Sequence, residues 1–388
     1  MDFSLTDQQK LIRDTVRQFM ETEARPRLKE LEREEKFPLD LLKKIADMGC
    51  CGMLMPEDWG GPGLDTVSYV LMIEEVARVY TAMSTALGVT NSAVQIPILQ
   101  FGTEAQKQKY LKRLATGEIL GSFCLTEAAA GSDAAGIQAT ATRQPVAQGG
   151  SPAAFSYRLN GAKTWVTNGS VAGVYIVFAK TNPAAGGKGI TAFLVEPTFK
   201  GFKIGRHEDK MGQRSSPSVE ILFNECEVPA ENRIGEEGQG MKIALTALDG
   251  GRIGIAAQAV GLAQGALDES IKYAKQRRAF GKSISEFQAI QWMIADMQTE
   301  LEAARGLTYY AAWLRDSGKP MGSAASKAKL YASEMVNRVV YKAVQIHGSV
   351  GYSRETDVER MYRDARVITI YEGTSEVQRM IIARDLLK

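Results

Sequence analysis

The hydrophobic and polar positions divide the chain into three zones of different period. From residue 1 to about 122, and again from about 234 to the end, apolar residues recur every three or four positions, as on one face of a helix. From about 123 to 233, short apolar runs and alternating patterns indicate strands, with Gly, Pro and Asn between them. No convincing helix separates these strands, so the pattern predicts a β domain and not a βαβ array.

The first zone opens with a predicted helix whose start is marked by a capping box. Thr6 and Gln9 have the spacing of a reciprocal cap, and the apolar residues within 12–20 then share one face. A second helix is expected over 39–48, ending at Gly49, because glycine readily takes the left-handed conformation that closes a helix. The stretch 144–152 is rich in Gly, Ala and Pro and is expected to be an exposed hairpin loop.

The last zone has the pattern of an antiparallel helix bundle. Ser285 and Gln288 suggest a capping box, and small residues over 254–263 would allow a second helix to approach closely. A seam of apolar residues at alternating steps of three and four is formed by Phe287, Ile290, Ile294, Met297, Leu301 and Ala304. The sequence therefore predicts an α+β multidomain chain: an N-terminal α-helical domain (1–122), a middle antiparallel β-barrel or sandwich domain (123–233) and a C-terminal four-helix-bundle domain (234–388).

Composition and charge exclude several classes of partner. The 388 residues are 45% hydrophobic and 24% charged, which is ordinary for a globular protein. The net charge is +2 and no basic tail or stripe is present, so a nucleic-acid partner is not expected. No apolar run approaches the roughly 20 residues that span a bilayer, and the N-terminus opens on a polar segment. We therefore expect neither a membrane span nor secretion, and a location in a bacterial cytoplasm or a mitochondrial matrix.

The scarcity of histidine and cysteine limits the possible chemistry. Only two histidines occur, and the chain has neither a Gly-x-Ser-x-Gly elbow nor a His-Glu-x-x-His motif, which argues against a serine or a zinc hydrolase. The four cysteines form no Cys-x-x-Cys pair, so neither a metal site nor a disulfide framework is expected. Catalysis would therefore depend on carboxylates or on a bound organic cofactor.

Three segments carry side chains suited to binding or catalysis. The run 123–133 joins two zones, and its small residues would let a ligand reach the backbone; the alternative is a turn that caps a helix. Trp165 could stack on an aromatic ring, although an aromatic residue on a strand more often belongs to the core. Glu372 precedes a predicted helix that Thr374 or Ser375 would cap, so it would face the positive end of the helix dipole. It is, however, one of 45 acidic residues.

Short motifs along the whole chain together resemble the acyl-CoA dehydrogenase family. None is specific alone, but their order and spacing are, and the α, β, α zoning is that family's layout. In chain order the motifs are Met55-Pro56-Glu57, Trp59-Gly60-Gly61, Leu125-Thr126-Glu127, Gly131-Ser132-Asp133, Trp165-Val166-Thr167-Asn168-Gly169, Met211-Gly212-Gln213-Arg214, Asp249-Gly250-Gly251-Arg252, Arg277-Arg278-Ala279-Phe280-Gly281-Lys282, Gln345-Ile346-His347-Gly348 and Tyr371-Glu372-Gly373-Thr374-Ser375-Glu376.

The resemblance implies a role for individual residues. Glu372 matches the catalytic base that removes the α-proton of an acyl-CoA thioester, while the β-hydrogen leaves as hydride to FAD. The residues implied to contact the substrate are Ser132, Asp249, Arg252, Tyr371 and Gly373, of which Asp249 and Arg252 would hold the CoA moiety. Those implied to line the flavin are Phe123, Leu125, Thr126, Gly131, Ser132, Trp165, Val166 and Thr167. Those implied to bind the FAD of a neighbouring subunit are Arg277, Phe280, Gln288, Gln345, His347, Gly348 and Ser349, and further FAD contacts are implied for Thr374 and Glu376.

The resemblance also implies the reaction and its partners. The product would be a trans-2-enoyl-CoA, the electrons would pass to an electron-transfer flavoprotein, and the chain would form a homotetramer built as a pair of dimers. Preorganised donors would stabilise the charge that develops on the thioester carbonyl, and exclusion of water would raise the pKa of Glu372. A subgroup of the family places its base at the position of Gly251, which cannot act here. This favours Glu372 as the base and a short or short-branched acyl chain.

Two alternatives to this function stay open. An acyl-CoA oxidase on the same scaffold would release peroxide during turnover, and a non-catalytic helical scaffold would take up no FAD. Two positions depart from the family pattern: Ala128 stands where proline is common, and Ser349 replaces a usual glycine.

Overall fold

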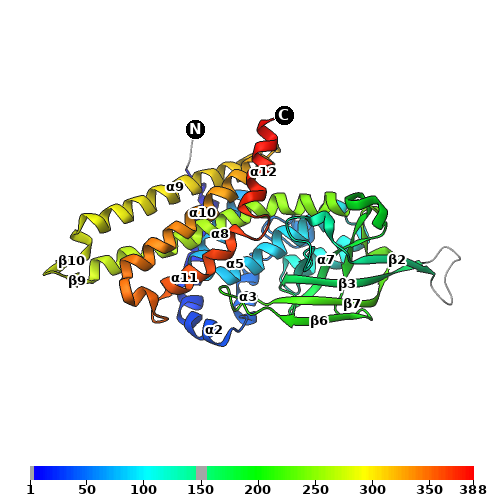
Figure 1. The fold of residues 1–388 in the computed structure, drawn as a ribbon, viewed down its shortest axis with the longest axis horizontal. Coiled ribbons are helices and arrows are strands. Elements are labelled where there is room, and N and C mark those ends of the chain that lie inside the picture. Colours follow the sequence, from blue (N-terminus) through cyan, green and yellow to red (C-terminus); the bar gives the residue numbers. More distant parts are fainter. Residues whose placement is uncertain (1–3, 146–154) are drawn as a thin grey trace.

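The computed structural model describes residues 4–145 and 155–388, and it has the α, β, α order that the sequence predicts. Figure 1 shows the sheet at one end of the molecule, with long C-terminal helices reaching away from it and the N-terminal helices packed between. Within the described ranges, none of the helices combines the length and the apolar character that crossing a membrane requires.

The N-terminal part is helical up to residue 115. The capping box at Thr6 and Gln9 is confirmed, since each residue's side chain bonds the other's backbone N–H. The second predicted helix is also confirmed, and Gly49 follows it with φ +81°. The helices are α1 (Asp7–Phe19), α2 (Leu28–Glu34), α3 (Leu39–Asp47), α4 (Thr66–Val79), α5 (Thr81–Gly88), the π-helix η4 (Val89–Val94), α6 (Gln95–Phe101) and α7 (Glu104–Ala115).

The middle part is an eight-stranded sheet with the order β6-β7-β3-β2-β4-β5-β8, and β1 also pairs with β4. The prediction of an antiparallel sheet is correct for most pairs, but β1–β4 and the single β2–β4 pair are parallel. Residues 146–152 of the predicted hairpin loop lie outside the described residues, and the strand before them ends at Pro145. The strands are β1 (Leu120–Cys124), β2 (Thr140–Pro145), β3 (Phe155–Thr167), β4 (Ala172–Lys180), β5 (Ile190–Val195), β6 (Phe202–His207), β7 (Ser218–Pro229) and β8 (Arg233–Ile234).

The C-terminal part is built on long antiparallel helices. The predicted capping box at Ser285 and Gln288 is wrong: Ser283 and Glu286 form the box instead, on a 3-10 turn that precedes the helix. This spacing wins because the two-stranded hairpin ends at Ser283. The elements are α8 (Gly240–Gln276), β9 (Arg278–Ala279), β10 (Lys282–Ser283), α9 (Gln288–Asp316), α10 (Gly322–His347), α11 (Asp357–Ala365) and α12 (Ser375–Leu386).

Helix α8 is the central element of the core. It packs against α4, α9 and α10, and its N-terminal end lies over the sheet (Figure 1). The close approach expected from its small residues is confirmed, because a β-carbon at Gly261 or Gly265 would lie 2.2 Å from a backbone oxygen of α4. A single helix therefore links the helical core to the edge of the β domain, where a site can form between them.

Candidate active site

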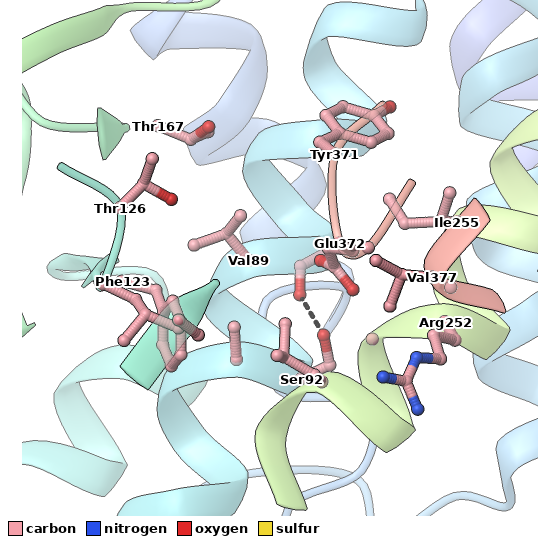
Figure 2. Close-up of a pocket in the computed structure, with 18 of the residues that line it drawn as sticks. Val89, Ser92, Phe123, Thr126, Thr167, Arg252, Ile255, Tyr371, Glu372 and Val377 are labelled. Carbon is pink, nitrogen blue, oxygen red and sulfur yellow. Dashed lines mark hydrogen bonds between the residues drawn. The ribbon is translucent and has the colours of Figure 1, made fainter. Parts of the chain in front are cut away.

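A cavity of about 460 Å³ lies where the three parts of the chain meet. Its lining combines the end of β1 and the loop after it, the end of β3, the α5–η4 segment, one face of α8 and the turn before α12. Figure 2 shows Phe123, Thr126 and Thr167 on one side and Tyr371, Glu372 and Arg252 on the other, with Val89 and Ser92 between them. The structure thus brings together segments that are more than 200 residues apart in the sequence.

The wall from the β domain has an apolar surface that carries hydroxyl groups. Of the residues predicted to line the flavin, all but one line this cavity; they are Phe123, Leu125, Thr126, Gly131, Ser132, Trp165 and Thr167. The exception is Val166, which points into the core of the sheet and does not line the cavity. The hydroxyls of Thr126 and Thr167 make no hydrogen bond to any residue that the structure describes, so both remain free for a ligand.

Trp165 belongs to this wall and not to the core, so the core interpretation is wrong. Its side chain is 58% exposed although it stands on a strand, and its backbone has φ +58°, which non-glycine residues seldom adopt. The register with β7 shifts at this point, between Lys163 and Val166. An irregular strand therefore turns a large aromatic ring towards the cavity, where it offers a flat surface to a planar ligand.

Glu372 provides the carboxylate of the opposite wall. The residue lies just before α12, whose N-cap is Thr374, as predicted; the Thr374 hydroxyl accepts a hydrogen bond from the N–H of Val377. The carboxylate lies over the bare backbone of Gly251 on α8, and Oε2 has no hydrogen-bond partner among the described residues. Burial raises the pKa of Glu372 to about 7, against the opposing effect of two nearby cations, Arg252 and Lys329. The carboxylate is therefore poised to exchange a proton near neutral pH.

Arg252 and Asp249 form an ion pair on α8 beside Glu372. Arg252 is only 4% exposed and lines the cavity, whereas Asp249 is half-exposed and does not. Burial raises the pKa of Asp249, and Arg252 opposes that effect. Burial also lowers the pKa of Arg252, with Asp249 and Glu372 opposing. Arg252 is thus paired directly with Asp249, and its positive charge also lowers the pKa of the Glu372 carboxylate.

Tyr371 is fixed by two glutamines. Its hydroxyl donates to Oε1 of Gln258 on α8 and accepts from Nε2 of Gln213, 3.3 Å away. Gln258 in turn donates to Thr85 of α5, and all of these side chains except Gln213 line the cavity. Tyr371, which precedes Glu372, is therefore held by a buried hydrogen-bond network. Gly373, which follows Glu372, also lines the cavity.

Helices α4 and α5 with η4 supply residues that the sequence analysis did not single out. Tyr69 is fully buried, with its hydroxyl 2.5 Å from the position of a β-carbon on Gly254. The η4 segment beside the cavity is a π-helix, and such irregular turns are often found at functional sites. The available signal was a group of polar residues in a buried helical stretch: Ser84, Thr85, Thr90, Asn91, Ser92 and Gln95.

The remaining predicted cofactor residues lie outside this cavity. Thr374 and Glu376 line a second hollow of about 390 Å³, and Gln345 lines a third of about 580 Å³. The last group gathers at the far ends of α8, α9 and α10, where Phe280 is 94% exposed and His347 stacks on Tyr273 at 4.3 Å. Its members are Arg277, Phe280, Gln288, His347, Gly348 and Ser349. The structure therefore separates the predicted FAD contacts into those that line the cavity and those on an outer surface, at the ends of α8, α9 and α10.

Three family models match the chain and together cover most of it. They are described as the acyl-CoA dehydrogenase N-terminal domain, over residues 6–118, the middle domain, over 122–226, and the C-terminal domain, over 238–387.

Three similar proteins have names that state a function. CarC, a subunit of the caffeyl-CoA reductase–Etf complex of Acetobacterium woodii, is 47% identical over 384 residues, covering 99% of each chain. The solved structure of butyryl-CoA dehydrogenase from Megasphaera elsdenii is 44% identical, with a TM-score of 0.96 and complete coverage of both chains. The solved structure of a glutaryl-CoA dehydrogenase from Mycobacterium smegmatis in complex with FADH2 is 30% identical, with a TM-score of 0.91, covering 98% of this chain and 95% of that one.

Proposed function

The chain belongs to the acyl-CoA dehydrogenase family, and from this premise we propose that it oxidises a short acyl-CoA thioester to the trans-2-enoyl-CoA with FAD as cofactor. The observation that carries the proposal is the position of Glu372. Its partly shielded carboxylate has no hydrogen-bond partner at Oε2 among the residues that the structure describes. It faces, across the cavity, a wall that carries an exposed indole and two hydroxyls not bonded within that described part of the chain.

Glu372 would remove the α-proton. The α-hydrogen of a thioester is a weak acid, so the base must be both well placed and basic. The pKa of about 7 leaves much of the carboxylate ionised at neutral pH while making it a stronger base than an exposed glutamate. Arg252 stabilises the ionised form, which keeps the pKa from rising further. The chain thus sets the basicity of Glu372 by balancing burial against charge.

The β-domain wall fits a flavin. Trp165 offers a flat face, Thr126 and Thr167 have free hydroxyls, and a β-carbon on Gly131 would meet nothing within 4 Å, so the backbone there is open to a ligand. When bound, FAD supplies the acceptor for the hydride that leaves the β-carbon of the substrate. Ser132, in the same loop, is placed to contact the substrate or the cofactor.

The acyl chain would lie between α4, α5, η4 and α8. Tyr69, Ser92 and Gln258 line this part of the cavity, and we favour a short acyl chain there. The resemblance to butyryl-CoA dehydrogenase supports the same length class. Asp249 and Arg252 would assist CoA binding on the α8 side of the cavity.

The outer surface points to an assembly. Arg277, Phe280 and Gln345 do not line the cavity that contains Glu372, and the β9–β10 hairpin lies at the end of the molecule away from the sheet (Figure 1). We therefore assign this surface to the FAD of a neighbouring subunit in a homotetramer built as a pair of dimers. The electron acceptor would be an electron-transfer flavoprotein, a proposal supported by the relative that is a subunit of a reductase–Etf complex.

The reverse reaction is the second candidate. CarC, which is 47% identical, is named as part of a reductase, and the same residues would serve reduction with Glu372 donating the α-proton. The reductive reaction is tested directly by mixing the chemically reduced protein with an enoyl-CoA in the absence of oxygen: reoxidation of the flavin supports this candidate, and no reoxidation would exclude it.

The direct test is an anaerobic titration of the purified protein with straight, branched and aromatic acyl-CoAs, following the absorbance of its flavin. A short acyl-CoA should bleach the flavin, and Glu372→Gln should bind the same thioester without bleaching. Protein that contains no FAD would support a non-catalytic scaffold, and rapid peroxide release in air would support an oxidase. Bleaching of Glu372→Gln at the wild-type rate would overturn the role of the carboxylate.

A further inference from the structure

A buried lysine lies behind the turn that carries Glu372. Lys329 is on α10, its side chain is 0% exposed, and its Nζ donates a hydrogen bond of 2.8 Å to the carbonyl oxygen of Gly373. A buried ammonium group is unfavourable unless its hydrogen bonds and nearby charges compensate for lost hydration. Among residues 4–145 and 155–388, no carboxylate forms an ion pair with Lys329. Its one direct partner is therefore the backbone beside the proposed base.

The turn that Lys329 contacts has an unusual conformation. Glu372 and Gly373 both have positive φ, +51° and +90°, and a non-glycine residue such as Glu372 rarely adopts this region. Gln378, on α12, donates from Nε2 to the carbonyl oxygens of both residues, at 3.2 and 3.0 Å. The carbonyl of Gly373 thus receives two side-chain donors, one from each of two helices. Such a conformation persists when the surrounding structure over-determines it.

The same lysine acts on the charge of the site. Four charged groups face it: Glu372 in the turn, Arg252 on α8, Glu376 on α12 and Glu334 on its own helix. The positive charge of Lys329 lowers the pKa of Glu372, as Arg252 also does. Burial in turn lowers the pKa of Lys329 to about 8, against the effect of Glu372. The two groups therefore influence each other's titration without touching.

We propose that Lys329 is a positioning residue for Glu372: its buried ammonium holds the Gly373 carbonyl, and so fixes the left-handed turn that directs the carboxylate over Gly251. The proposal rests on the proposed function, because it assigns to Lys329 the support of the base in that reaction. It explains why an ammonium group is buried in an alanine-rich stretch of α10, where Ala325, Ala328 and Ala332 are also fully buried.

The test compares Lys329→Met with Lys327→Met, an exposed lysine two residues away on the same helix. Each FAD-containing protein is incubated with an α-deuterated short acyl-CoA without an electron acceptor, and the loss of deuterium is followed by mass spectrometry from pH 5 to 9. Lys329→Met should slow the exchange by about 100-fold, since a misplacement of about 1 Å can have that effect. Its pH midpoint should rise by about one unit, because a neighbouring positive charge is lost. Lys327→Met should match the wild type.

A purely structural role would lower the melting temperature of Lys329→Met while leaving both the exchange rate and the pH midpoint of the folded variant as in the wild type, and this outcome would overturn the proposal. If Lys329→Met does not fold, Lys329→Gln decides, because it keeps a neutral donor for the Gly373 carbonyl. Its exchange should be faster at the plateau than that of Lys329→Ala, with a midpoint that still rises, and equal plateau rates in these two variants would count against the proposal. Absence of exchange in the wild type would instead refute the proposed function, whereas equal exchange in wild type and Lys329→Met would refute the role of Lys329 alone. Binding of the acyl-CoA should stay within about threefold of the wild type, since Lys329 is not among the residues that line the cavity.

Discussion

The carboxylate of Glu372 occupies the space that a side chain at Gly251 would need. A β-carbon built on Gly251 would lie 2.0 Å from Oε2 and 3.0 Å from Oε1 of Glu372. Real β-carbons essentially never approach another atom within 3.0 Å, so the observed position of the Glu372 carboxylate is incompatible with a side chain at residue 251. The helix can bring its backbone this close to the base only because residue 251 has no side chain.

Replacement of Gly251 by alanine should therefore displace the base. We expect Gly251→Ala to lower kcat by about 100-fold, the effect of misplacing a catalytic group by roughly 1 Å. Alanine favours the helix over glycine by about 1 kcal/mol, which partly offsets the clash, so the protein should still fold. Steady-state kinetics and circular dichroism measure both effects. Gly306→Ala on α9 is the matched control, since its β-carbon would meet nothing within 4 Å; full activity of Gly251→Ala would contradict the geometry.

The rate of the reaction should depend on pH through Glu372. A base acts only when deprotonated, and burial raises the pKa of this carboxyl to about 7. We therefore expect kcat/KM to fall below pH 7 and to reach a plateau above it. A pH–rate profile with a deuterated substrate, which isolates the proton-removal step, is the measurement. An acid limb near pH 4.5, the value of an exposed glutamate, would show that the carboxylate is solvated.

The same shift predicts a cost in stability at high pH. The folded-state pKa of Glu372 is above its unfolded value of about 4.5, so the folded protein binds the proton more tightly. Its contribution to stability is complete below the unfolded value and is lost as the pH rises through about 7. The free energy of unfolding of Glu372→Gln, relative to that of the wild type, should therefore increase by up to about 3 kcal/mol between pH 5 and pH 8. Urea unfolding at both pH values measures the difference, and a constant difference would argue against the raised pKa.

How far the sequence predicts this molecule depends on the range of the interactions. Local patterns give the three zones and the cap at Thr6, because capping and amphipathic faces involve residues close in the chain. The parallel pairing of β1 with β4 joins Leu120 to Ala172, and no local pattern records such a contact. The wrong cap at Ser285 has a related cause: two similar spacings overlap, and only the preceding hairpin selects Ser283.

The candidate site shows the same division. Glu372, Thr167 and Trp165 stand in short motifs that a sequence displays directly, and the structure brings all three to one cavity. Lys329 and Tyr69 lie in helices, where a polar residue in the sequence is normally interpreted as part of the solvent-exposed face. Their function depends on burial, and burial follows from packing of helices far apart in the chain.

A buried ion pair between Lys163 and Glu127 supports the β-domain wall of the cavity. Lys163 is fully buried, and its Nζ lies 2.7 Å from Oε1 of Glu127 and 3.1 Å from the carbonyl oxygen of Leu125, which lines the cavity. Breaking a buried ion pair by removing one partner costs about 3–5 kcal/mol, because the other charge stays buried. The free energy of unfolding of Lys163→Met, measured in urea, should be lower than that of the wild type by about this amount. The double variant Lys163→Met with Glu127→Gln should recover part of that free energy. Lys203→Met, at an exposed position of β6, is the control; equal losses in the single and double variants would exclude coupling.

The exposed indole of Trp165 should be required to retain the cofactor and not to fold the protein. Trp165→Ala removes the aromatic face from the cavity wall, while alanine meets the same restriction at φ +58° as tryptophan does, so the backbone strain is unchanged. We expect the Kd for FAD to rise by about 2- to 13-fold, and the FAD content after dialysis to fall, since loss of one aromatic stacking contact is worth roughly 0.5–1.5 kcal/mol. The melting temperature of the FAD-free protein should stay the same.

Trp313→Ala provides the comparison for this prediction, because Trp313 is 48% exposed but stacks on Tyr310 outside the cavity. Trp165→Gly adds a second one, since glycine adopts positive φ without strain. If FAD retention depended on the shape of the backbone alone, Trp165→Gly would retain as much FAD as the wild type. If it depends on the ring, as the open hydroxyl-lined wall beside Trp165 indicates, both Trp165 variants should lose FAD to the same extent, and Trp313→Ala should lose none.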